Sequence, residues 1–159
     1  MNEGVEWAMH CCVNLSLVGP DQAVTAAKLA AYYDLPTAYL NKQLQALARD
    51  GIVTSSPGPR GGFRLARPPE RITMMDVVTA IEGPEDAFRC AEIRRQGPHA
   101  ESRESNPARC LIDEGMRHAE LAWRRELAAR TIADIRAKVL ERAPGWTEVV
   151  RKRYSTGKA

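Results

Sequence analysis

Four cysteines and one carboxylate–imidazole pair are the side chains of this 159-residue chain best suited to metal or redox chemistry. Cys90 and Cys110 are separated by nineteen residues in a stretch rich in Glu, Arg, Gly, Pro and Ser. Glu6 and His10 lie four residues apart, which places both on one face of a helix. Because no secretion signal precedes them, the cysteines argue against a disulfide framework. Reactive thiols or metal ligands are the better interpretation.

Composition predicts one domain of ordinary size, or a small domain with an oligomerisation element. No apolar run approaches the ~20 residues of a membrane span, and the N-terminus lacks a signal-peptide pattern. We therefore expect a cytoplasmic protein with no membrane partner. The formal net charge of +3 is too small to argue for nucleic acid by itself. No nucleophile–base–orienter set, phosphate-binding loop or HExxH motif is present, so we do not expect an enzyme.

The run PGPRGGFRLARPPERITMMDVV, residues 57–78, predicts a β-hairpin with glycines at its tip. Residues 52–54 can pair with residues 63–65, and Gly61 and Gly62 supply the positive φ that such a tip needs. Arginines gather in or just after this hairpin: Arg60, Arg64, Arg67 and Arg71. A basic hairpin behind two short helices is what a winged helix-turn-helix places in a DNA groove.

Three helices are predicted before the hairpin, over about residues 5–17, 24–33 and 37–50, and Thr73 is predicted to cap a fourth over 74–82. Thr37 is the predicted N-cap of the third helix. The N-terminal half of that helix would face the major groove, as recognition helices do. The predicted DNA-contacting residues are Thr37, Tyr39, Lys42, Gln43, Arg60, Gly61 and Arg64.

The second half of the chain predicts a sensor loop followed by a dimerisation element. Residues 83–110 lack periodicity and are long for a loop. A helix over 111–142 would span about 45 Å, too long for a small head domain to cover, which favours a homodimer. The alternative is a helix folded back on its own domain. Residues 143–159 read as a basic, flexible tail. The predicted fold is mainly α with a small β-wing, a winged helix-turn-helix head over 1–82 plus a long C-terminal dimerisation helix.

The run RGGFRLARPPERITMMDVVTAIEGP resembles the wing and following helix of the IscR/NsrR/RsrR group of bacterial transcription regulators. The resemblance extends to AAKLAAYYDLPTAYLNKQLQALARDGIV before it and covers about residues 4–140. It implies a homodimer whose winged helices bind palindromic operators in double-stranded DNA, and a repressor is the expected form. Many members of the group carry a 2Fe–2S or 4Fe–4S cluster in the loop before the long helix.

This loop departs from the group's usual three closely spaced cysteines, since it has only Cys90 and Cys110. A 2Fe–2S cluster needs four protein ligands, and His can replace Cys on one iron. The resemblance implies that the first helix of one subunit lies near the loop of the other. The preferred site therefore joins Glu6 and His10 of one subunit with Cys90 and Cys110 of the other. Other candidate ligands, which the sequence leaves open, are His99, Cys11 and Cys12.

Mixed ligation of this kind suits a redox sensor. Replacing thiolates by imidazole raises a cluster's potential, and a ligand nitrogen that can be protonated couples electron transfer to protons. We therefore expect a transcription regulator that senses redox state through a 2Fe–2S cluster bound across the dimer. The alternative is a cluster-free member of the same group that senses thiol oxidation at Cys90 and Cys110 or binds a small metabolite.

Overall fold

The computed structural model describes residues 3–58, 60–98, 100, 102 and 108–155. The chain divides into two compact units. The first comprises residues 1–84 together with 127–159, and the second comprises residues 85–126.

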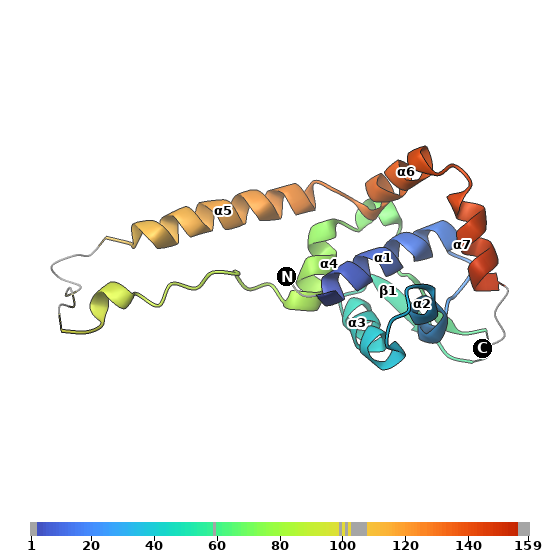
Figure 1. The fold of residues 1–159 in the computed structure, drawn as a ribbon, viewed down its shortest axis with the longest axis horizontal. Coiled ribbons are helices and arrows are strands. Elements are labelled where there is room, and N and C mark those ends of the chain that lie inside the picture. The colour runs from blue at the N-terminus through green and yellow to red at the C-terminus, as the bar shows by residue number, and fades with distance from the viewer. Residues whose placement is uncertain (1–2, 59, 99, 101, 103–107, 156–159) are drawn as a thin grey trace. The chain divides into compact units, whose positions relative to one another are not determined.

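The first unit is built around α1 (Glu3–Val18), whose residues 11–18 are all buried. α1 contacts α3, α4, α6 and α7 (Figure 1). These neighbours and α2 have the bounds α2 Ala26–Tyr32, α3 Thr37–Arg49, α4 Met74–Glu82, α6 Ile132–Arg142 and α7 Trp146–Ser155. The core they share is aliphatic; its largest fully buried side chains include Leu15, Leu29, Leu40, Leu44, Leu47, Ile52, Ile72 and Ile132.

α2 and α3 form the predicted helix-turn-helix. Thr25 caps α2, because its hydroxyl accepts a hydrogen bond from the Lys28 amide at 3.3 Å. The turn contains Asp34, whose φ of 54° is left-handed. The N-cap of α3 is Pro36, which makes no side-chain bond, so the prediction that Thr37 caps this helix is wrong. Thr37 is instead its first helical residue.

The wing is a two-stranded antiparallel sheet of β1 (Val53–Ser56) and β2 (Gly62–Leu65), which confirms the predicted hairpin. Val53 lies opposite Leu65. A Cβ atom on Gly61 would lie 2.2 Å from the carbonyl oxygen of Ser56. The wing turn therefore needs glycine there for close backbone approach.

The long helix predicted over 111–142 is two helices, α5 (Leu111–Ala128) and α6. Thr131 starts α6 with a capping box, in which its hydroxyl accepts from the Asp134 amide and the Asp134 carboxylate accepts from the Thr131 amide. Thr73 and Asp76 form the same arrangement at α4, as predicted for Thr73. The predicted apolar stripe runs on from Leu127 to Ile132, on either side of the break, so periodicity alone did not reveal it.

The chain after residue 143 also differs from the predicted flexible tail, because residues 146–155 form α7. Val150 and Tyr154, one turn apart, are buried against the core of the first unit. The Asn14 side-chain amide donates to the hydroxyls of Tyr33 and Tyr154, both at 2.9 Å. These contacts pair a polar side chain inside α1 and fix α7 to it.

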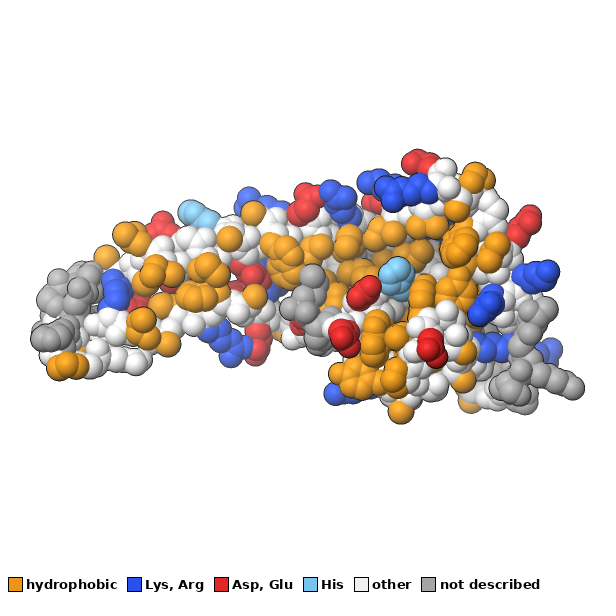
Figure 2. All heavy atoms as spheres, in the orientation of Figure 1, with side chains coloured by type: hydrophobic (Ala, Val, Ile, Leu, Met, Phe, Trp, Pro, Cys, Tyr) orange, Lys and Arg blue, Asp and Glu red, His pale blue; other side chains and the backbone are white. Residues whose placement is uncertain are grey.

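The second unit contains most of α5 and the segment 85–110. Among the described residues of that segment, the short 3₁₀ helix η2 (Ile93–Arg95) is the only helical part. The Arg124 guanidinium binds the Glu120 carboxylate at 2.8 Å and the Glu85 carbonyl at 2.9 Å, which joins the segment to α5. Hydrophobic side chains lie open on the face of this unit that Figure 2 shows. The exposed large hydrophobic side chains of α5 include Leu111, Ile112, Met116 and Leu121. Dimerisation through α5 stays a prediction. In the described part of the chain, we find no helix with the length and apolarity of a membrane span.

Candidate metal centre and nucleic-acid interface

Cys90 and Cys110 lie together in the second unit, close enough for the Cys90 side chain to help lower the pKa of the Cys110 thiol. Cys110 directly precedes α5 and is 8% exposed. Its carbonyl accepts a hydrogen bond from the Glu114 amide at 3.0 Å, which is the first backbone hydrogen bond of the helix. The structure thus brings together two sulfur ligands that are nineteen residues apart in sequence.

The start of α5 favours the thiolate form of Cys110. The pKa of its thiol is lowered chiefly by the Asp113 amide, which donates to the sulfur. Burial opposes this shift, while the Ile112 amide, the positive charge of Arg94 and the Cys90 thiol support it. Thiolates are the form that binds metals and attacks oxidants. Sequence reasoning missed the role of Asp113; its signal was a cysteine placed at the first residue before a helix.

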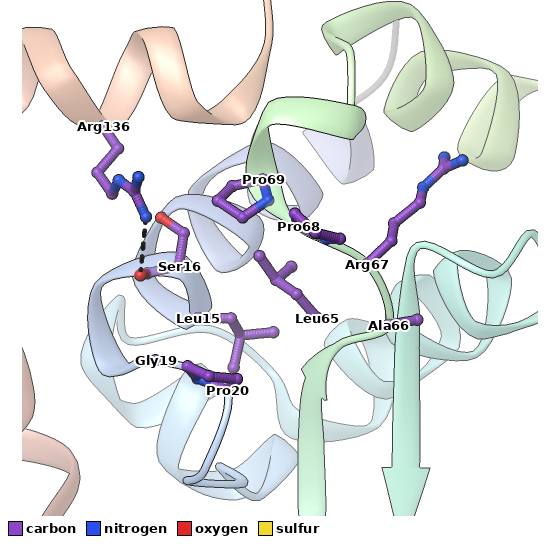
Figure 3. A pocket seen from close by; sticks show the side chains of 10 residues that line it. All are labelled: Leu15, Ser16, Gly19, Pro20, Leu65, Ala66, Arg67, Pro68, Pro69 and Arg136. Carbon is purple, nitrogen blue, oxygen red and sulfur yellow. Dashed lines mark hydrogen bonds between the residues drawn. The ribbon is translucent and has the colours of Figure 1, made fainter.

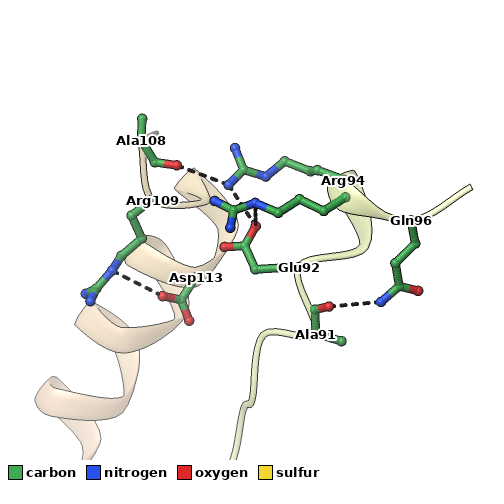
Figure 4. Close-up of polar contacts among 8 residues, drawn as sticks. Ala91, Glu92, Arg94, Gln96, Ala108, Arg109 and Asp113 are labelled. Atoms are coloured by element: carbon green, nitrogen blue, oxygen red, sulfur yellow. Dashed lines mark hydrogen bonds and ion pairs between the residues drawn. The ribbon is translucent and has the colours of Figure 1, made fainter. Parts of the chain in front are cut away.

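A polar frame holds the segment that carries Cys90 against the start of α5 (Figure 4). The Arg94 guanidinium donates to the Glu92 carboxylate at 2.9 Å and to the Ala108 carbonyl at 3.1 Å. Arg95 also faces Glu92, at 3.7 Å. Because Ala108 lies two residues before Cys110, these contacts help to fix the spacing of the two thiols.

An open cavity of about 530 Å³ lies beside Cys90. One wall is apolar, formed by Phe88. Apart from Cys90, the other side chains that line the cavity are charged: Glu85, Asp86, Arg89, Glu92, Asp113 and Arg117. Cys90 therefore borders a polar, accessible space within its own unit.

Glu6 and His10 share one exposed face of α1 in the first unit, as predicted. They border an open cavity of about 430 Å³. Apart from Glu3, its other walls are apolar and consist of Val5, Met9, Met74, Val78 and Leu127. The His10 ring packs against the Tyr33 ring with centroids 5.2 Å apart. Two possible ligands thus stand at the edge of an apolar hollow.

The four predicted ligands fall into two pairs, one in each unit of the chain. Within the described residues, no group of three or more His, Cys, Asp or Glu side chains could hold a metal ion. Each pair offers two ligands, whereas a 2Fe–2S cluster takes four. Two thiols, a carboxylate and an imidazole are nonetheless a donor set of the right chemistry and number.

The other candidate ligands have different settings. Cys11 and Cys12 of α1 are completely buried in the hydrophobic core of the first unit. Burial raises the pKa of the Cys11 thiol to about 12 and raises that of the Cys12 thiol further. Both thiols therefore stay protonated and act as small core residues. His99 lies outside the described residues. His118 is exposed on α5.

The predicted DNA-contacting face is largely exposed. Tyr39 is 52% exposed on α3, and its ring meets the Trp7 ring of α1 edge-on with centroids 5.3 Å apart. Thr37, Lys42, Arg60 and Arg64 are also exposed, whereas Gly61 is buried in the wing turn. Gln43 differs from the prediction, because it is only 7% exposed. Its position in the helix turns it toward the core beside Leu40 and Leu44. The Gln43 side chain is therefore too buried to contact a DNA groove, contrary to the prediction.

A further cavity of about 350 Å³ lies between the end of α1, the segment after β2 and α6 (Figure 3). Its walls are apolar, formed by Leu15, Pro20, Leu65, Pro68 and Pro69. Arg136 at its edge is already paired, since its guanidinium binds the Ser16 carbonyl at 3.5 Å and the Glu70 carboxylate at 3.2 Å. Arg67 also lines the cavity, and its guanidinium pairs with the Asp76 carboxylate at 3.3 Å. The size is that of a small-molecule pocket.

A family model described as Rrf2, iron-dependent transcriptional regulator, matches residues 1–138. The protein rrf2 of Nitratidesulfovibrio vulgaris is 30% identical to this chain over 123 residues, or 77% of each chain. A helix-turn-helix-type regulator, BadM of Rhodopseudomonas palustris, is 40% identical over 63 residues, and this match spans only 40% of each chain.

Two solved structures share the fold at low identity. CymR, the global cysteine regulator of B. subtilis, matches with a TM-score of 0.67 at 20% identity, covering 87% of this chain and 96% of CymR. IscR of T. potens matches with a TM-score of 0.68 at 17% identity, covering 90% of each chain. These likenesses confirm the predicted fold class, mainly helical with a small β-wing.

Proposed function

Because the chain belongs to the Rrf2 family of transcriptional regulators, we propose that it is a homodimeric, DNA-binding repressor that senses redox state through a 2Fe–2S cluster. The observation that carries this proposal is the Cys90–Cys110 pair, whose side chains lie close together at the start of α5, where the pKa of Cys110 is lowered. A pair of neighbouring thiols, of which Cys110 has a lowered pKa, is suited to bind one iron.

Glu6 and His10 are proposed to hold the second iron from the other subunit. Both are exposed on one face of α1 and border a mainly apolar cavity. A wall of this kind would limit water access, and the surroundings of a cluster tune its potential. The cluster would supply one-electron chemistry, taking an electron from a cellular reductant and returning it to an oxidant. The chain's own residues would set how readily this happens.

The Trp7–Tyr39 contact gives the proposal a route to DNA. Trp7 is next to Glu6 in α1, and its ring packs edge-on against Tyr39 on the exposed half of α3. A shift of α1 at Glu6 would therefore reach a side chain that we propose to contact the operator. Arg60 and Arg64 on the wing would bind the adjacent groove and its phosphates.

The first test is a visible absorption spectrum with iron and sulfide analysis, on protein purified without oxygen. We expect absorption between about 400 and 500 nm and a 2Fe–2S stoichiometry. Glu6→Ala, His10→Ala, Cys90→Ala and Cys110→Ala should each lose or alter the cluster. Glu3→Ala and His118→Ala are matched controls, because they remove an exposed acid and an exposed imidazole without removing a proposed ligand. A colourless, iron-free wild type after reconstitution would contradict the cluster proposal.

Mixed dimers test whether the site crosses the subunit interface. One subunit carries Glu6→Ala and His10→Ala, and its partner carries Cys90→Ala and Cys110→Ala. If each site takes two residues from each subunit, one site of the mixed dimer keeps all four ligands and binds a cluster. If each site lies within one subunit, neither site is complete and the mixed dimer stays colourless.

The thiol pair also supports a second candidate, a cluster-free sensor of thiol oxidation. Cys90 and Cys110 lie close together and the pKa of Cys110 is lowered, so an oxidant such as a peroxide could take two electrons from the two thiols and form a disulfide. This protein would be colourless, and its DNA affinity would follow the disulfide state. Cys90→Ala would then abolish the redox response without any change in visible absorption.

A further inference from the structure

The C-terminal helix α7 lies beyond residues 1–138, the part that matches the family model, yet it is firmly built into the first unit. The Arg151 guanidinium donates to the Leu17 carbonyl at 3.1 Å, and the Lys28 ammonium donates to the Tyr154 carbonyl at 2.9 Å. Each contact satisfies a carbonyl at the C-terminal end of a helix. The last turn of α7 therefore has a defined place on the head.

That place is on the wing side of the head. Lys28 belongs to the first turn of α2, and Val24, just before α2, is bridged to Phe63 of β2 by two backbone hydrogen bonds of 2.9 and 2.8 Å. Hydrogen bonds thus link the end of α7 to the start of α2, and the residue just before α2 to strand β2. In Figure 1, α7 lies at the same end of this unit as the loop joining β1 and β2.

This edge of the head is basic. The Arg153 guanidinium lies over the Tyr32 ring, 5.8 Å from its centroid, which orients the side chain while leaving it exposed. Lys152 is its exposed neighbour. The nearest acid in sequence to Lys152 is Glu148, in the first turn of α7, and the nearest to Tyr32 is Asp34, two residues after it. Figure 2 shows Lys and Arg side chains gathered at this end.

We propose that the last turn of α7, through Lys152 and Arg153, binds phosphates of duplex DNA that flank the stretch contacted by α3 and the wing. This inference rests on the proposed DNA binding by the winged helix. A phosphate draws Lys and Arg and releases its condensed counterions when they bind. Such contacts add affinity without sequence preference, so α7 would lengthen the DNA footprint and leave the recognised sequence unchanged.

The test measures binding by fluorescence anisotropy, using a duplex selected from a random pool with the full-length wild-type protein. A long form extends about ten base pairs, one helical turn, beyond each half-site, and a short form ends at the half-sites. On the long duplex, Lys152→Ala/Arg153→Ala should bind roughly three- to tenfold more weakly at low salt. The slope of log Kd against log salt should fall by about 0.9 for each phosphate that the variant no longer neutralises. On the short duplex, this variant and wild type should bind alike.

Three controls keep the result specific. Lys138→Ala/Arg142→Ala removes the same charge from exposed positions on α6 and should leave the flank dependence unchanged. Arg153→Lys keeps the charge but loses the planar stacking on Tyr32, and it should retain most of the long-duplex affinity. Arg60→Ala tests the wing separately.

Equal loss of affinity on both duplexes, or equal salt slopes for the α7 variant and its α6 control, would overturn the α7 proposal. If Arg60→Ala weakens binding while the α7 variant does not, only the α7 proposal fails. If neither variant changes binding, the proposed winged-helix contact fails as well.

Discussion

Thr73 and Thr131 face each other in an antiparallel β-bridge, and each begins the helix that follows it. The Met74 amide donates to the Arg130 carbonyl and the Ile132 amide donates to the Ile72 carbonyl, both at 2.8 Å. α4 and α6 therefore start side by side, each with a capping box. This pairing fixes where α6 begins.

Thr131→Ala should lower the free energy of unfolding by about 1 kcal/mol, because it leaves the Asp134 amide without its hydroxyl acceptor. Urea denaturation followed by circular dichroism measures the change. Thr131→Ser is the matched control, since it keeps the hydroxyl, and it should stay close to wild type. Equal loss in both variants would mean that the methyl group, and not the cap, stabilises the start of α6.

Asp134 should make stability depend on acid pH. Its pKa is lowered, first by the hydrogen bond from the Thr131 amide and then by that from the Thr131 hydroxyl. A carboxyl with a lowered folded-state pKa stabilises above its unfolded pKa of about 3.9, and this contribution is lost as pH falls through the folded value. Between about pH 4 and pH 2, unfolding free energy should fall more steeply in wild type than in Asp134→Asn. Parallel curves would contradict the assignment.

The elements that the sequence predicted well are those marked by local signals. Gly61 and Gly62 marked the hairpin, although Gly62 has the predicted positive φ and Gly61 does not, and Thr73 marked the start of α4. The break before α6 was missed, although Thr131 and Asp134 form the same Thr-x-x-Asp signature as Thr73 and Asp76, because an unbroken apolar stripe carried more weight. The stability of α7 depends on Val150 and Tyr154 packing against a distant helix, which no local pattern contains.

In the candidate site, too, local spacing predicted some features and missed those that depend on contacts between distant segments. The i, i+4 spacing placed Glu6 and His10 on one exposed helix face, and the structure agrees. The contact between Cys90 and Cys110 depends on a loop folding against α5, so spacing could only suggest it. Gln43 was misassigned because its polar side chain was given more weight than its spacing, which is three residues after Leu40 and four before Leu47 and places it on the buried face.

Tyr154→Phe should destabilise the protein by about 1–3 kcal/mol, because it leaves a buried amide proton of Asn14 without an acceptor. Tyr39→Phe is the control, since Tyr39 is 52% exposed and its hydroxyl can bind water; it should be near neutral. In a double variant, Tyr154→Phe/Asn14→Leu should lose less stability than the two single losses added together. Additive losses would show that the hydrogen bond contributes little.

Gly62→Ala should disrupt the wing. Gly62 has a φ of +141°, and a Cβ atom there would lie 2.5 Å from the carbonyl carbon of Val24. The left-handed backbone alone costs roughly 1–2 kcal/mol for other residues, so we expect a loss above about 2 kcal/mol once the clash is added. Calorimetry and DNA binding measure the two consequences. Gly145→Ala, where a Cβ atom meets no neighbour within 4 Å, is the matched control and should change neither.

Thiol labelling should separate the four cysteines into two classes. In metal-free, reduced protein, iodoacetamide should modify Cys90 and Cys110, while Cys11 and Cys12 react only after unfolding, because burial raises the pKa of Cys11 to about 12 and that of Cys12 further. Peptide mass spectrometry at increasing urea concentration resolves each site. In protein that carries the proposed cluster, Cys90 and Cys110 should also be protected, and chelation should restore their labelling. Labelling of Cys11 or Cys12 in the folded protein would contradict their place in the core, and labelling of Cys90 in cluster-loaded protein would remove it from the ligand set.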